Sequence, residues 1–133
     1  MKKNTDLALL IIRLTVSLLM LTHGIAKLQH GVDMIGQMLT SKGLPSFIAY
    51  GVIVGEVLAP ILIIVGFRTR IAAGILLFNM IVAIAMAHSG DLFKFTEHGS
   101  LALEIHWFYV FSSLALMISG AGKYALSTRN KWD

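Results

Sequence analysis

Four long stretches of the chain are apolar almost throughout, at residues 7–28, 46–67, 71–88 and 101–122. About 20 residues of α-helix cross the roughly 30 Å hydrocarbon core of a bilayer, so each stretch can span a membrane. The second and third stretches are separated only by Arg68-Thr69-Arg70, which predicts an antiparallel hairpin. The pattern therefore predicts an all-α fold, an integral membrane four-helix bundle that forms a single domain over residues 1–133.

The composition agrees with a membrane protein. Hydrophobic residues make up 56% of the 133 residues and charged residues 14%, where a soluble domain carries roughly 25% charged residues. The net charge is +4, but the cations form no clustered stripe of the kind that binds nucleic acid, so we expect no nucleic-acid partner. The chain has no cysteine, which excludes disulfides, thiolate metal sites and dithiol redox chemistry by its own side chains.

The apolar stretches are interrupted by polar side chains. Because an ionisable group in hydrocarbon is costly, each is a candidate for a functional site. These residues are Arg13, His23, Lys27, Glu56, Asn79, His88 and Glu104.

The depths of Arg13 and Glu56 along their helices predict a buried ion pair between them. Arg13 lies about 9 Å above the inner end of the first helix and Glu56 lies near mid-depth in the second, a difference that a long side chain bridges. Pro60 lacks the amide that would bond the carbonyl of Glu56, so this carbonyl is expected to be free. Asn79 is expected to form a hydrogen bond between helices.

A second cluster is expected at the outer end of the bundle, where His23, Lys27, His88 and Glu104 lie at similar depth. Glu104 shares a helical face with Phe108 and Phe111, which are expected to form an aromatic wall. His106 lies on the opposite side of that helix and is interpreted as an interfacial residue.

The two outer loops are expected to contribute to the same end of the bundle. Val32, Ile35, Met38 and Leu39 recur at helical spacing, which predicts a short interfacial helix between residues 30 and 46. The loop at residues 89–100 is expected to fold over the mouth of the bundle. No metal-ligand spacing and no catalytic signature is present, so we expect no metal site and leave open whether the protein is an enzyme.

Several short motifs appear in an order that resembles the DoxX/DoxD-like family of small bacterial membrane proteins. They are Arg13-Leu14, His23-Gly24-Ile25-Ala26-Lys27-Leu28, Lys42-Gly43-Leu44-Pro45, Gly55-Glu56, Gly66, Arg68-Thr69-Arg70-Ile71-Ala72-Ala73, His88, Glu104 and Gly120-Ala121-Gly122-Lys123-Tyr124. The resemblance implies a four-helix membrane bundle, linked in some relatives to quinone-dependent oxidation of sulfur compounds and in others to membrane redox or detoxification complexes. It also implies a polar core of Arg13, His23, Lys27, Glu56, His88 and Glu104. The absence of cysteine departs from any relative that works by thiol exchange.

These features favour a multi-pass protein of the bacterial inner membrane that is a small subunit of a redox system. Its polar core is expected to bind a quinone-like or other small ligand near the outer face. The alternatives are a non-catalytic scaffold that assembles a partner, and a small-molecule permease. The expected partner is the lipid bilayer. A redox partner protein and a second copy of the chain are further possible partners.

The distribution of Lys and Arg predicts that both termini are cytoplasmic. The face with the termini carries Lys2, Lys3, Arg68, Arg70, Lys123, Arg129 and Lys131, and the other face carries Lys42 and Lys94. Cytoplasmic loops are enriched in Lys and Arg. The first stretch is too long for a signal peptide and no small-residue cleavage site follows it, so we expect it to be retained.

Reporter fusions at Asp133 and near Glu97 test this topology. A reporter that is active only in the cytoplasm should be active at Asp133 and inactive near Glu97. Activity of an external reporter fused at Asp133 would contradict the predicted orientation.

Overall fold

The computed structural model describes residues 4–133, and all its regular secondary structure there is helical, which confirms the all-α part of the predicted fold class. The first helix, α1, spans Thr5–His30, and the short helix α2 spans Asp33–Ser41. Then follows one broken helical stretch, made of η1 (Ser46–Tyr50), α3 (Gly51–Ile53), the π-helical turn η2 (Val54–Leu58) and α4 (Ala59–Val65). The chain continues through α5 (Thr69–Ala87), η3 (Ser89–Asp91) and α6 (Glu104–Ser119).

Within residues 4–133, three helical stretches are long and apolar enough to cross a membrane, namely Thr5–His30, Ser46–Val65 and Thr69–Ala87. They match the first three predicted spans to within a few residues. The fourth, α6, has 16 residues, and at 1.5 Å per residue it measures about 24 Å, less than the hydrocarbon core. A fourth membrane crossing therefore stays a prediction.

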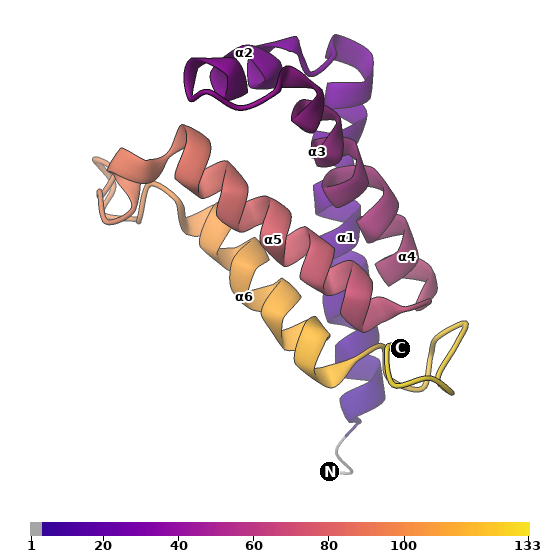
Figure 1. The fold of residues 1–133 in the computed structure, drawn as a ribbon. Coiled ribbons are helices and arrows are strands. Elements are labelled where there is room, and N and C mark those ends of the chain that lie inside the picture. Colours follow the sequence, from indigo (N-terminus) through magenta and orange to yellow (C-terminus); the bar gives the residue numbers. More distant parts are fainter. Residues whose placement is uncertain (1–3) are drawn as a thin grey trace.

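The helices form two pairs that converge at one end of the molecule. Helix α5 packs along α6 in antiparallel fashion, and α4 packs against α1 (Figure 1). The pairs meet near the beginning of α1 and the end of α6, which we call the terminal end. They diverge toward the opposite end, where α2 lies and which we call the α2 end (Figure 1).

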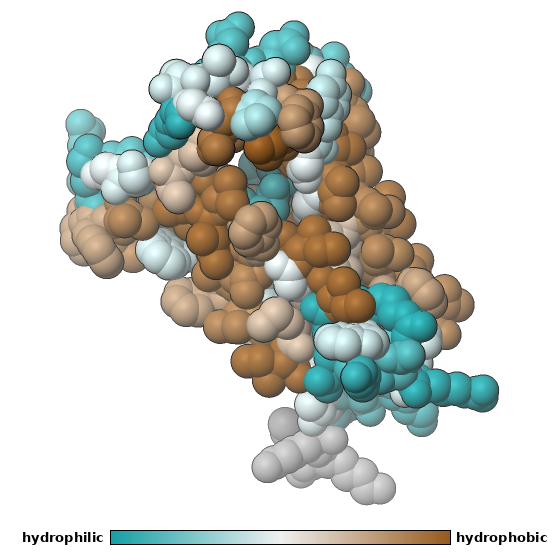
Figure 2. All heavy atoms as spheres, viewed as in Figure 1, coloured by the Kyte–Doolittle hydropathy of each residue, from teal (hydrophilic) through white to brown (hydrophobic). Residues whose placement is uncertain are grey.

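Apolar side chains fill the space between the helices and also cover the outside. Val16, Ile63, Leu76 and Leu116, one from each of α1, α4, α5 and α6, are completely buried in one core. Large hydrophobic side chains such as Phe78 are exposed, and Figure 2 shows a mostly hydrophobic surface along the helices. A helix that is apolar on all sides suits a protein whose solvent is lipid.

Arg13 ties the terminal end together. Its guanidinium group is buried and donates four hydrogen bonds to backbone carbonyls: Nε to Ile63 (3.0 Å), Nη2 to Ile64 (2.9 Å), and Nη1 to Ala121 (2.6 Å) and Tyr124 (2.9 Å). Ile63 and Ile64 lie in the last turn of α4, whose carbonyls lack partners within the helix. A cation at a helix C-terminus is also favoured by the helix dipole.

The predicted ion pair between Arg13 and Glu56 is therefore wrong. Glu56 lies in η2, seven residues before Ile63, and pairs with Lys27 instead. Depth alone suggested the pair, but the backbone carbonyls at the end of α4 lie closer to the guanidinium and need donors of their own.

The segment after α6 folds back over the turn between α4 and α5. The carboxylate of Asp133 accepts hydrogen bonds from the hydroxyl of Ser127 (2.7 Å) and from the backbone N–H groups of Asn130 (2.8 Å) and Arg68 (3.3 Å). The hydrogen bond from Ser127 is the main cause that lowers the pKa of the Asp133 carboxyl. Also at the terminal end, the carboxylate of Asp6 accepts a hydrogen bond from the backbone N–H of Lys123 (2.9 Å).

Replacement of Arg13 by leucine should strongly destabilise the protein, by roughly 4 kcal/mol or more, because each of the four carbonyls left without a donor costs about 1–3 kcal/mol. Arg13→Lys should recover part of the loss, since an ammonium keeps the charge but matches fewer of the four acceptors. The measurement is the melting temperature in detergent.

Since Arg13 and Glu56 share no partner, Arg13→Leu combined with Glu56→Leu should be as destabilising as the sum of the two single changes. Rescue of one substitution by the other would show that the two residues interact after all.

Candidate functional site

A cavity of about 260 Å³ lies between the two helix pairs at the α2 end. Its lining comes from α1, α2, residues 46–58, α5 and α6. Most of the wall is apolar, and it includes four methionines, Met20, Met38, Met80 and Met86. Figure 2 shows a hollow below the region of α2, where hydrophilic atoms lie between hydrophobic surfaces.

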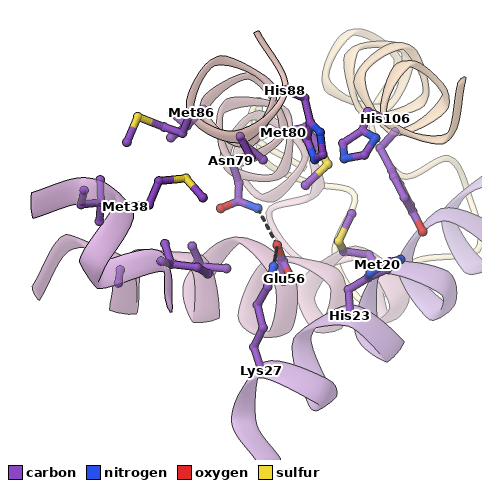
Figure 3. Close-up of a pocket in the computed structure, with 18 of the residues that line it drawn as sticks. Met20, His23, Lys27, Met38, Glu56, Asn79, Met80, Met86, His88 and His106 are labelled. Atoms are coloured by element: carbon purple, nitrogen blue, oxygen red, sulfur yellow. Dashed lines mark hydrogen bonds and ion pairs between the residues drawn. The ribbon is translucent and has the colours of Figure 1, made fainter. Parts of the chain in front are cut away.

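The polar centre of the cavity is an ion pair between Lys27 of α1 and Glu56 of η2 (Figure 3). The Glu56 side chain is 3% exposed and that of Lys27 32% exposed. Glu56 Oε1 accepts from Lys27 Nζ and from Asn79 Nδ2 of α5, the latter at 3.3 Å. The expected interhelical hydrogen bond of Asn79 is thus confirmed, and three helical segments meet at one carboxylate.

The sequence around Glu56 brings these segments close. Pro60 has no N–H, so the α-helical bond to the Glu56 carbonyl is not formed, and the N–H of Ala59 donates instead to the carbonyl of Val54 five residues before it. Such a π-helical turn widens the helix locally and is frequent at functional sites.

Two glycines permit the close approach on both sides of Glu56. A Cβ on Gly24 of α1 would overlap the backbone of Glu56, and a Cβ on Gly55 would overlap the side chain of Asn79. Lys27 follows Gly24 by three residues, so the helix contact at Gly24 places Lys27 on the face toward Glu56. Gly55 and the buried Ala59, four residues apart, therefore lie on the face of this helical stretch that packs within the chain.

Three histidines lie around this pair. The rings of His88 and His106 have centroids 4.8 Å apart, and the ring of His23 meets that of Tyr109 edge-on at 6.2 Å. The Nδ1 atom of His106 is buried and has no hydrogen-bond partner among residues 4–133. Sequence reasoning left His106 out of the site, but this residue lines the cavity.

The structure brings together four of the six predicted site residues, His23, Lys27, Glu56 and His88. Arg13 lies at the terminal end, and Glu104 is exposed outside the cavity. Phe108 and Phe111 are likewise 46% and 61% exposed, so they form no wall of the cavity. Tyr109, which is 4% exposed, takes that position.

The two outer loops behave differently. The predicted helix at residues 30–46 is present as α2, and Val32 and Leu39 pack with Ala49 of η1 beside the cavity. The loop at residues 89–100 contributes no side chain to the cavity, and Phe93 is 81% exposed. The expectation that this loop folds over the mouth is wrong, since α2 and η1 cover that position.

Over residues 4–133, no group of three or more His, Asp or Glu side chains is arranged to hold a metal ion. What the cavity offers is an apolar space with a charged pair, an amide, a phenol and imidazoles at its edge. Those groups can hold an organic molecule that has a few oxygen atoms on an apolar body.

Sequence reasoning missed Tyr109 and the four methionines as parts of the site. His106, Tyr109, Ser113 and Leu116 follow one another at intervals of three or four residues, the spacing of one helical face. The face with Glu104 and Phe108 shows the same spacing. Only the packing of α6 against α5 could therefore have shown which of the two faces points inward.

The fold and the cavity define a small helical membrane protein with a mostly apolar cavity, in which the buried Glu56 pairs with the partly exposed Lys27. The sequence profile of the family described as DoxX matches residues 8–89, more than half of the chain, and the chain belongs to this family. The matched region runs from the first turn of α1 to just beyond the end of α5 and contains most of the cavity lining.

A relative from Bacillus subtilis (strain 168), named "Putative oxidoreductase CatD", is 32% identical over 84 residues. The match covers 63% of this chain and 62% of the relative, so it spans less than two thirds of that protein. No solved structure matches the chain.

The ion pair of the cavity predicts a specific pattern of stability changes. Lys27→Leu should destabilise the protein because it leaves the Glu56 carboxylate buried without its cation. Glu56→Leu should also destabilise it, because it leaves the partly buried Lys27 ammonium without its anion. The double substitution should recover part of the loss. In a double-mutant cycle of unfolding free energies, the coupling between the two residues should be about 0.5–3 kcal/mol. Strictly additive effects would show that the two side chains do not interact.

Proposed function

We propose that the protein is a small subunit of a redox system in the bacterial inner membrane, and that its cavity binds the ring of a quinone-like molecule. The observation that carries the proposal is the Lys27–Glu56 pair inside a mostly apolar cavity. Buried charges of this kind in a membrane protein are costly and are retained where they bind or move something.

The size of the cavity suits a ring of this kind. An apolar cavity of about 150 Å³ accommodates benzene, so about 260 Å³ has room for a substituted or fused ring. The methionine side chains are flexible and polarisable, and they adapt to flat aromatic ligands. Since drug-sized ligands occupy about 300–1,000 Å³, a long apolar tail would have to lie outside the cavity.

The groups at the edge of the cavity suit the proton transfers of quinone chemistry. Interconversion of a quinone and a hydroquinone moves two electrons and two protons, and an imidazole such as that of His23, His88 or His106 is a side chain that can accept or donate a proton. The chain has no cysteine to carry the electrons as a dithiol, so we assign the electron transfer to a partner protein. The family membership and the name of the Bacillus subtilis relative support a redox role.

The proposed orientation places the α2 end at the outer face and the terminal end in the cytoplasm. This follows from the excess of Lys and Arg at the terminal end. A quinone in the bilayer would then reach the cavity between the diverging helix pairs, and a partner would exchange electrons with it at the outer face.

Ligand binding can be tested by thermal shift in detergent with 2,3-dimethyl-1,4-naphthoquinone, in its oxidised and in its chemically reduced form. At a concentration 100 times the Kd, at least one form should stabilise the wild-type protein by about 2.7 kcal/mol. Ala83→Phe, which fills the cavity from α5, should remove this response.

Ala85→Phe is the matched control, because Ala85 lies two residues further along α5 and is exposed outside the cavity. It should keep the response of the wild type. If the wild type responds to neither form, the protein is better explained as a scaffold that assembles a partner, and the proposed function is wrong.

A further inference from the structure

The two oxygens of the Glu56 carboxylate have different surroundings. Oε1 accepts from both Lys27 and Asn79, whereas Oε2 is buried and has no hydrogen-bond partner within residues 4–133. Glu56 as a whole is 2% exposed and lines the cavity. Glu56 thus carries, at the wall of the cavity, a buried acceptor that receives no hydrogen bond from the described residues.

A buried acceptor without a donor is costly, and the cost is greatest for a charged group. Asn79 already donates to Oε1, and Lys27 is drawn to the same oxygen. The donor that completes the carboxylate can therefore come from the contents of the cavity.

We propose that Glu56 Oε2 accepts a hydrogen bond from a hydroxyl group of the ligand, so that the cavity prefers the reduced, hydroxyl-bearing form of the ring over its oxidised, carbonyl form. This inference rests on the proposed function, since it specifies which member of the redox pair the same cavity holds more tightly. It concerns binding alone and involves no transfer of electrons at Glu56.

The preference follows from whether the ligand offers a donor or an acceptor to Glu56 Oε2. A hydroxyl hydrogen pointing at a carboxylate oxygen forms a charge-assisted hydrogen bond, which is short and about twice as strong as a neutral one. A carbonyl oxygen in the same position would place lone pairs against lone pairs and would leave Oε2 unsatisfied. Lys27 can donate to either form, so it does not cancel the difference.

The wild-type protein should bind the reduced form of 2,3-dimethyl-1,4-naphthoquinone about tenfold or more tightly than the oxidised form, because a hydrogen bond to a charged group is worth about that ratio. Titrations are made without oxygen, with dithionite alone as the blank. The dimethyl ether of the reduced form has the same ring but no O–H, and it should bind no better than the oxidised form.

Glu56→Gln gives the sharpest test because it should reverse the preference. The amide oxygen of the glutamine is expected to face the donors Lys27 and Asn79, which turns the amide NH₂ toward the position of Oε2. A donor then replaces the acceptor, so the variant should lose affinity for the reduced form and gain affinity for the oxidised form. Glu104→Gln makes the same chemical change outside the cavity and should leave the ratio unchanged.

The outcomes separate this inference from the proposed function. Equal binding of both forms by the wild type, or tighter binding of the oxidised form, would overturn the inference while quinone binding itself stands. A reversed ratio in Glu56→Gln that follows a preference for the reduced form in the wild type supports it. A Glu56→Gln protein with an unchanged ratio shows that another group makes the distinction, which also overturns the assignment to Oε2.

Discussion

A single buried guanidinium group holds the molecule closed at one end. Arg13 satisfies four backbone carbonyls that belong to α4 and to the segment after α6, so it joins three parts of the chain that are distant in sequence. Water is scarce inside a bilayer, and unsatisfied backbone groups there are expensive. The charge of Arg13 and the unpaired carbonyls therefore stabilise each other, and neither is tolerable alone.

Because the helix pairs are fixed together at the terminal end, they can diverge at the other end without separating. The divergence leaves the space between α1, α5 and α6 that becomes the cavity, and α2 with η1 covers its apolar edge. The π-helical turn at Glu56 and the glycines at positions 24 and 55 then pull three segments back together at one point. The same packing thus produces both features: the cavity lies where the helix pairs diverge, and its polar centre lies where three helical segments are in contact.

The sequence predicted the helices well because apolar length and turn residues determine them locally, and α2 followed from the spacing of Val32, Met38 and Leu39. Four of the six expected site residues meet because polar groups in a bilayer gather away from lipid. The partner of Arg13 could not be predicted from side chains, since its partners are backbone carbonyls. The buried face of α6 was missed for a different reason: the helix is apolar on both faces, so hydrophobicity does not say whether His106 or Glu104 points inward.

The Lys27–Glu56 pair explains why this cavity can be selective as well as apolar. A pair with no net charge lowers the cost of burial, yet it leaves Glu56 Oε2 as a strong acceptor and Lys27 as a strong donor at fixed positions. A ligand of hydrocarbon alone would fit the wall but would leave this acceptor unsatisfied, and a strongly polar ligand would lose its water without compensation from the methionines. The proposed ligand, a flat apolar ring that carries hydroxyl groups at its edge, meets both requirements, and molecules of this kind also dissolve in a bilayer.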